Sequence, residues 1–272
     1  MTGNAISSLD VPDKVIEFLD GHDMWQEPYR DLLSLLPGIC ADDAYQCQFE
    51  LMDRRAARGD AVIGYKAAGT TRSARELLGG GISPVMGTLT RSLLMDEGAT
   101  FTVRPGKTFV EAEIAVLLGR DLAGPDVTYL DAITAIDGYL PAMEISPWSP
   151  AVIEKKRSQQ HLLATQKTSG KIVIGRSVAK PSFDLRYEGA VVEVNGEVVA
   201  TGAGAEVMGD PVNVVVALAN NLARFGRQLR AGMIIMTGSV AEPLPADMSI
   251  TDARVTFSRL GSLGVRFTTA LG

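Results

Sequence analysis

The sequence predicts an α+β fold, because its first fifth and its remainder carry different hydrophobic patterns. Residues 1–58 place apolar side chains at helical spacing, as in the run VIEFL at 15–19. From about residue 60 the chain consists of short apolar runs broken by glycine, which is typical of strands and turns. Strands and helices then follow one another irregularly, not as repeated strand–helix–strand units. We therefore expect an N-terminal helical region at 1–58 and a mixed-sheet domain at 59–272.

Composition narrows the class of partner. The net charge of −6 argues against a nucleic-acid ligand. No apolar run reaches 18 residues and the first twenty residues carry acids, so we expect neither a membrane span nor an export signal, and a cytoplasmic location. Cys40, Cys47, His22 and His161 form no close cluster, which disfavours zinc. Any metal should be a hard ion held by oxygen.

The first half of the chain is assigned from periodicity and turn residues. A helix is expected after a cap at Asp42 or Asp43, and a short one at 70–81 ends in glycines. The runs AVIGYKAAG at 61–69, TFVEAEIAVLLG at 108–119 and GYLPAMEIS at 138–146 are expected strands, and VTYLDAITAID at 127–137 is an expected amphipathic helix.

In the second half, the run GAVVEVNGEVVATG predicts a β-hairpin, because Asn195–Gly196 is a preferred type I′ turn pair. A helix capped by Asp210, with proline at its first position, is expected at 210–226. The remaining expectations are strands at 171–175 and 233–240 and a closing hairpin at 253–270.

Glu111 and Glu113 are the most informative pair of residues. Positions two apart in a strand face the same side, so both carboxylates project together from an apolar segment. In a buried site one of them would tend to protonate, unless a cation neutralised the pair. The alternative is a strand with one solvated face, and this segment alone does not decide between the two.

Glu144 favours the cation. It lies in the apolar run LPAMEI, where an unpaired carboxylate would cost several kcal/mol. Three converging carboxylates form the oxygen-rich set that Mg²⁺, Mn²⁺ or Ca²⁺ prefers. The alternative is a salt bridge from Glu144 to a lysine or arginine.

Two further segments suggest substrate contacts. Lys66, in another apolar strand, is a candidate to hold a substrate carboxylate or an enolate oxygen, and the alternative is a lysine that reaches water from a strand end. Thr237–Gly238–Ser239 follows a buried strand, where glycine lets backbone N–H groups approach an anion closely, although strand-ending glycines are common.

Taken together, these segments resemble the 2-keto-4-pentenoate hydratase and 2-oxo-acid decarboxylase family of the fumarylacetoacetate hydrolase superfamily. The resemblance runs from about residue 41 to the end. Its motifs are GYK at 64–66, VEAEIAVLLGRDLAGP at 110–125, PAMEI at 141–145, and the blocks at 195–226 and 229–240.

The resemblance implies a mixed β-sheet roll or sandwich, with the helical region at its N-terminus. It implies Mg²⁺ or Mn²⁺ held by Glu111, Glu113 and Glu144, a catalytic Lys66, and a substrate-binding segment at 237–239. It also implies a homo-oligomer, and some hydratase-like chains form complexes with a related decarboxylase.

The sequence departs from the family where proton transfer is expected. The family's D-[FY]-G-x-L stretch is VMGTL at 85–89 here, which lacks the acid. The family's Asp and Arg after the third glutamate are replaced by SPWSP at 146–150, and its D-T-x-A-D-N-A-S-S-G stretch is HLLATQKTSG at 161–170. His161 or Lys167 is a candidate replacement acid or base, since histidine titrates near neutrality. The alternative for His161 is a surface helix residue.

The expected function is therefore that of a metal-dependent lyase, either a hydratase or a decarboxylase. Its substrate would be a small 2-oxo or 2-hydroxy-dienoic acid that reacts through a dienolate held by the metal. One alternative is a C–C bond hydrolase of the acylpyruvate or fumarylacetoacetate type, with His161 or His22 as base. Another is a divergent member with a biosynthetic or structural-subunit role.

Overall fold

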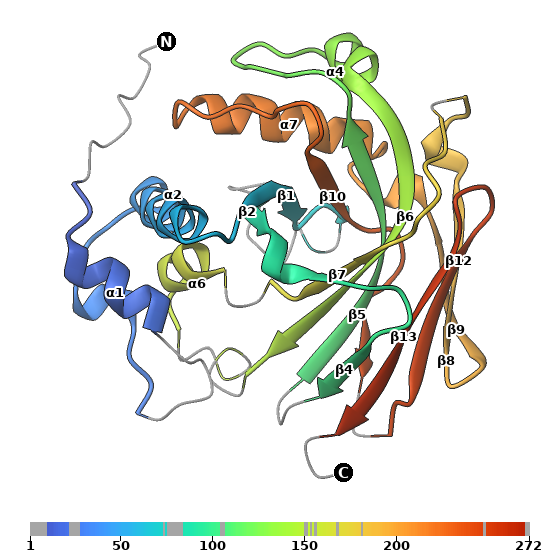
Figure 1. Cartoon of the computed structure of the whole chain (residues 1–272), viewed down its shortest axis with the longest axis horizontal. Helices are drawn as coiled ribbons and strands as arrows, with labels where there is room; N and C mark the ends of the chain where they lie inside the picture. The colour runs from blue at the N-terminus through green and yellow to red at the C-terminus, as the bar shows by residue number, and fades with distance from the viewer. Residues whose placement is uncertain are drawn as a thin grey trace.

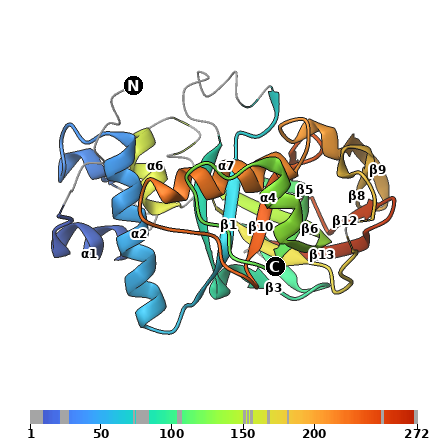
Figure 2. The ribbon, with the colours of Figure 1, turned by 90° about the horizontal axis from the view of Figure 1, so that it is seen from above.

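Two β-sheets and a layer of helices make up the part of the chain that the computed structural model describes. That part is 10–21, 28–72, 74, 84–103, 107–149, 152, 154, 157–166, 169–180, 182–246 and 249–269. Figure 1 shows α1 and α2 at one end of the molecule, with the strands β8, β9, β12 and β13 at the other, and Figure 2 shows the same arrangement from above. The expected α+β class with a mixed sheet is confirmed.

The larger sheet has the strand order β2-β1-β10-β5-β6-β7-β3, and β11 adds to the edge of β5. Its strands β1 and β10 are parallel, as are β3 and β7, while the other neighbouring pairs are antiparallel. The bounds are β1 Val62–Ala68, β2 Val85–Thr90, β3 Leu94–Met95, β5 Lys107–Leu118, β6 Ile136–Trp148, β7 Lys171–Ile174, β10 Ile234–Ser239 and β11 Leu244–Ala246.

The smaller sheet has the order β4-β13-β12-β8-β9. Its bounds are β4 Thr100–Val103, β8 Gly189–Val194, β9 Glu197–Ala203, β12 Asp252–Phe257 and β13 Gly261–Thr269. The predicted hairpin at 189–202 is confirmed, because Asn195 and Gly196 both adopt positive φ, at 52° and 81°, as a type I′ turn requires. The closing hairpin, β12–β13, is confirmed as well.

The helices lie mostly where periodicity placed them. They are α1 Asp13–Gly21, α2 Ala41–Ala57, α4 Tyr129–Ala135, α6 Gln159–Thr165 and α7 Val212–Ala223. The predicted cap of α7 is wrong by one residue, since the N-cap is Pro211; the Asp210 side chain nevertheless accepts a hydrogen bond from Val212 N at 2.9 Å. None of the helices in the described segments is long and apolar enough to cross a membrane. The helix expected at 70–81 lies largely outside the described residues.

The predicted cap of α2 is wrong by two or three residues. The N-cap is Cys40, and Asp43 stands at the third helical position, where its Oδ2 accepts a hydrogen bond from Cys40 N at 2.9 Å. An acid at this position closes a capping box from inside the helix, which a sequence pattern does not separate from an acid at the cap itself.

A buried glutamine joins the helical layer to the larger sheet. Gln48 of α2 has no solvent exposure. Its Nε2 donates to Leu163 O of α6 at 2.7 Å and to Met86 O of β2 at 3.4 Å, and its Oε1 accepts from Thr88 Oγ1 at 3.2 Å. One side chain therefore fixes α2, α6 and β2 relative to one another.

We predict that Gln48→Leu lowers the free energy of unfolding by about 1–3 kcal/mol, because it leaves buried carbonyls and a hydroxyl without their partner. Chemical denaturation of the full chain measures the change. The matched control is Gln159→Leu at an exposed position of α6, which should stay within about 0.5 kcal/mol of the parent. Equal effects of the two substitutions would contradict the structural role of Gln48.

Candidate active site

Three carboxylates meet on one face of the β5–β6 pair. Glu111 and Glu113 lie two apart on β5, and the antiparallel register sets Glu111 opposite Glu144 of β6. Glu113 and Glu144 are each only 1% exposed, while Glu111 is half-buried. The strand register therefore places these three side chains on one face of the sheet.

Lys66 supplies a buried positive charge at the same place. It lies on β1, is 8% exposed, and its Nζ donates to both carboxylate oxygens of Glu144, at 2.5 Å for Oε2. The alternative in which Lys66 reaches water is wrong. The alternative in which Glu144 forms a salt bridge is correct, and its partner is the candidate catalytic lysine.

Three further donors hold the carboxylates in place. Ser146 Oγ donates at 2.9 Å to Glu111 and at 3.1 Å to Glu144. Gly170 N donates to Glu144 Oε1 at 2.9 Å, and Gly238 N to Glu113 Oε2 at 2.7 Å. Sequence reasoning missed Ser146, although it lies two residues after Glu144 and therefore on the same strand face.

The segment 237–239 reaches the site through its backbone. Gly238 adopts a φ of +96°, and a Cβ at this position would lie 2.0 Å from Thr70 Oγ1, so glycine is required there. Its N–H meets the Glu113 carboxylate, while the hydroxyls bond to carbonyls: Thr237 to Ile114 O at 2.8 Å and Ser239 to Ala241 O at 2.6 Å. The sequence predicts that this segment brings a backbone N–H close to an anion. In the structure the Gly238 N–H does so, and the anion is the Glu113 carboxylate.

Burial and mutual charge shift the pKa values of the clustered groups. Burial and the charge of Glu144 raise the pKa of Glu111 to about 7, and burial with both other carboxylates raises the pKa of Glu113 well above its usual range. Burial opposes the charge of Lys66, but Glu144, Glu111 and Glu113 outweigh it and raise the lysine pKa. The raised pKa values of Glu111 and Glu113 show that these poorly solvated carboxyls resist ionising together.

The side of the site formed by β2 is neutral. Gly87 has no room for a side chain, because a Cβ there would lie 2.7 Å from Lys66 Cγ and 2.8 Å from Gln166 Oε1. Gln166 follows α6 with a left-handed φ of 50°, and its Oε1 accepts a hydrogen bond from Thr88 N. Sequence reasoning missed Gln166, since neither its spacing nor its residue type marks it as a neighbour of Lys66.

The expectation for His161 needs correction. It is fully buried, so it is not a surface residue. Its Nδ1 accepts from Leu32 N at 3.0 Å, and its ring packs edge-on against Phe18, with 6.1 Å between the ring centroids. These contacts tie α6 to the N-terminal region. Lys167 and His22 lie outside the described residues.

Comparisons with known proteins give the family. Residues 65–267 match the family model described as fumarylacetoacetate (FAA) hydrolase C-terminal. The chain belongs to the fumarylacetoacetate hydrolase family. Its relatives include a 2-hydroxypent-2,4-dienoate hydratase of Pseudomonas putida, 34% identical over 69% of this chain and 85% of that protein. A 4-oxalocrotonate decarboxylase of Pseudomonas putida is 34% identical over 85% of this chain and 87% of that protein.

A solved structure agrees with these sequence relatives. The 4-oxalocrotonate decarboxylase from Pseudomonas putida G7, complexed with magnesium and adipate, is similar with a TM-score of 0.82 at 30% identity, over 93% of this chain and 96% of that one. The expected FAA hydrolase-type fold is confirmed. The chain is an enzyme of the hydratase and decarboxylase group, a hydro-lyase or carboxy-lyase, as its sequence predicted.

We predict a pH-dependent effect of Glu111→Gln on the metal-free protein. The pKa of Glu111 rises from about 4.5 to about 7 on folding, so the folded chain holds this proton more tightly. The stability that the protonated group contributes is present below pH 4.5 and is lost as the pH rises to 7. Glu111→Gln should therefore gain stability relative to the parent between pH 5 and pH 8, measured by denaturation in chelator.

The matched control for this prediction is Glu197→Gln, at an exposed position in the β8–β9 hairpin. Its stability difference from the parent should not grow over the same pH range. A pH-independent difference for Glu111→Gln would show that its carboxyl is not confined as the geometry indicates.

Proposed function

We propose that Glu111, Glu113 and Glu144 bind a divalent cation, Mg²⁺ or Mn²⁺, and that the chain acts on a small 2-oxo or 2-hydroxy-dienoic acid. The observation that carries the proposal is the gathering of three carboxylates and one ammonium on the strands β1, β5 and β6. The names of the relatives and the magnesium in the decarboxylase structure support it.

The donor set fits such an ion. With all groups ionised, three carboxylates and one ammonium leave two negative charges, which a divalent cation would neutralise. Lys66 already acts as a stand-in cation beside Glu144. As the side chains stand, no three acidic, histidine or cysteine groups in the described segments form a ready metal cluster, and the Glu144 carboxylate is paired with Lys66.

When bound, the cation would act as a Lewis acid toward the oxygens of a 2-oxo acid. The residues of the chain then have separate tasks. Lys66 adds positive charge where an enolate oxygen forms, and Ser146 with Gly238 N holds Glu111 and Glu113 in place. Gln166 offers a neutral amide next to Lys66, in place of a titrating acid.

Hydration and decarboxylation both need a cation and a positive charge beside the 2-oxygen, because both proceed through an enolate of the substrate. The relatives include enzymes of both kinds at similar identity. We propose Lys167 as the acid or base in preference to His161, because His161 Nδ1 already accepts a hydrogen bond from Leu32 N at 3.0 Å. The hydrolase alternative needs a histidine base, His161 or His22, and the fumarylpyruvate hydrolase structure at 15% identity supports only the fold.

We further propose that the chain forms a homo-oligomer or a complex with a related lyase, and that it is cytoplasmic. Large apolar side chains at the surface support self-association: Leu130 of α4 is 64% exposed, and Tyr187 of the 3₁₀ turn Leu185–Tyr187 is 73% exposed. Light scattering of the purified chain measures the assembly directly.

We predict that Glu113→Gln lowers metal-dependent turnover at least about 100-fold, since loss of an outer partner of a metal ligand alone costs 10- to 100-fold. The assay presents 2-hydroxypenta-2,4-dienoate and 4-oxalocrotonate, with Mg²⁺, with Mn²⁺ and in chelator, and follows loss of the conjugated absorbance. Product analysis separates hydration from decarboxylation. The exposed control Glu197→Gln should keep full activity.

Metal binding has its own readout besides activity. Mg²⁺ or Mn²⁺ should raise the melting temperature of the parent chain, and should raise it less in Glu113→Gln. Full activity of Glu113→Gln, or a parent chain that neither binds nor responds to either ion, would contradict the proposed site.

A further inference from the structure

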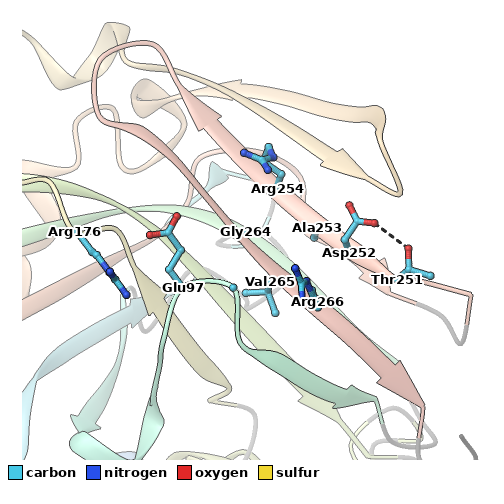
Figure 3. Close-up of a pocket in the computed structure, with 10 residues that line it drawn as sticks. Glu97, Arg176, Thr251, Asp252, Ala253, Arg254, Gly264, Val265 and Arg266 are labelled. Atoms are coloured by element: carbon cyan, nitrogen blue, oxygen red, sulfur yellow. Dashed lines mark hydrogen bonds between the residues drawn. The ribbon is translucent and has the colours of Figure 1, made fainter.

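A pocket lies on the smaller sheet and shares no residue with the carboxylate site. Figure 3 shows its walls: Arg254 comes from β12, Arg266 from β13, Glu97 from the turn before β4, and Arg176 from the segment after β7. The pocket has a volume of about 680 Å³. That volume lies in the range of sites that take metabolite-sized ligands.

The frame of this pocket is fixed by backbone bonds. β12 and β13 pair in register, with Arg254 opposite Gly264 and Asp252 opposite Arg266. The turn that carries Glu97 is held to β13, because Gly98 N donates to Gly264 O at 2.9 Å and Arg266 N donates to Ala99 O at 3.0 Å. The side chains thus project from a rigid base, as a binding site requires.

The charge in the pocket is not balanced internally. Arg176, Arg254 and Arg266 face two acids, Glu97 and Asp252, and none of these arginines forms an ion pair with another residue of the described part. Asp252 Oδ2 instead accepts a hydrogen bond from Thr251 Oγ1 at 2.9 Å.

Elsewhere the chain pairs many of its arginines. Among the described residues, six arginines outside the pocket form ion pairs with nearby acids: Arg54, Arg55, Arg58, Arg186, Arg224 and Arg227. The whole chain carries a net charge of −6, so this local excess of guanidinium groups runs against its overall charge. Three such groups on three separate segments present planar donors to one space, which suits the oxygens of carboxylate or phosphate.

We propose that this pocket binds a small oxyanion ligand, a metabolite with phosphate or carboxylate groups, separately from the catalytic site. Arg254 and Arg266 grip the anionic group from adjacent strands, and Arg176 closes over it from the opposite wall. Glu97 and Asp252 lie in the same pocket and accept hydrogen bonds from hydroxyl or amine groups of the ligand.

The test is a calorimetric titration of the full chain in Mg²⁺ with inorganic phosphate, with pyrophosphate and with succinate. Saturable binding of one ligand per chain is expected, at least tenfold weaker in Arg254→Gln and undetectable in the double variant Arg254→Gln, Arg266→Gln. Arg120→Gln, at an exposed position outside the pocket, is the matched control and should bind as the parent does. Tighter binding of the phosphates or of succinate identifies the ligand group, and either result supports the proposal.

A second arm separates this pocket from the metal site. Binding at the arginines should persist after chelator removes Mg²⁺, because no metal is needed there, and it should be unchanged in Glu113→Gln. Failure of the proposed metal function would leave this result intact. Anion binding that does not saturate, that is equal in the arginine variants, or that vanishes with the metal would overturn the proposal.

Discussion

The antiparallel pairing of β5 with β6 is the constraint on which the active site depends. Its register sets Glu111 opposite Glu144, and because side chains alternate along a strand, Glu113 falls on the same face. The apolar positions secure this register, since Ile114, Met143 and Ile145 are fully buried. A slip of the β5–β6 register by one residue would turn carboxylates toward the apolar core. The packing of the core therefore also assembles the active site.

Burying three carboxylates is costly, and the surrounding groups only partly offset the cost. Lys66 supplies one charge, while Ser146, Gly170 N and Gly238 N supply hydrogen bonds. The raised pKa values of Glu111 and Glu113 show the remaining imbalance. A fold selected for stability alone would place apolar residues here, so the cluster indicates a site kept for its chemistry.

The helical layer supports the neutral wall of this site. Gln48 joins α2 and α6 to β2, and His161 anchors α6 to the segment around Leu32. β2 carries Gly87, whose missing side chain lets Lys66 and Gln166 lie close together. The N-terminal helices therefore act on the active site indirectly, by fixing the strand next to the lysine.

The sequence by itself determined the elements and the acidic face. Alternation on β5 put Glu111 and Glu113 on one side, Asn195–Gly196 defined a turn, and apolar periodicity located α1, α2, α4 and α7, because each of these depends on neighbours along the chain. Tertiary structure decided the rest. The Lys66–Glu144 pair joins residues 78 apart, and Gln166 reaches Thr88 over the same separation. His161 looked like a surface residue because its charged neighbours dominate the local pattern, whereas burial depends on α1 and the segment near Leu32, which no local pattern encodes.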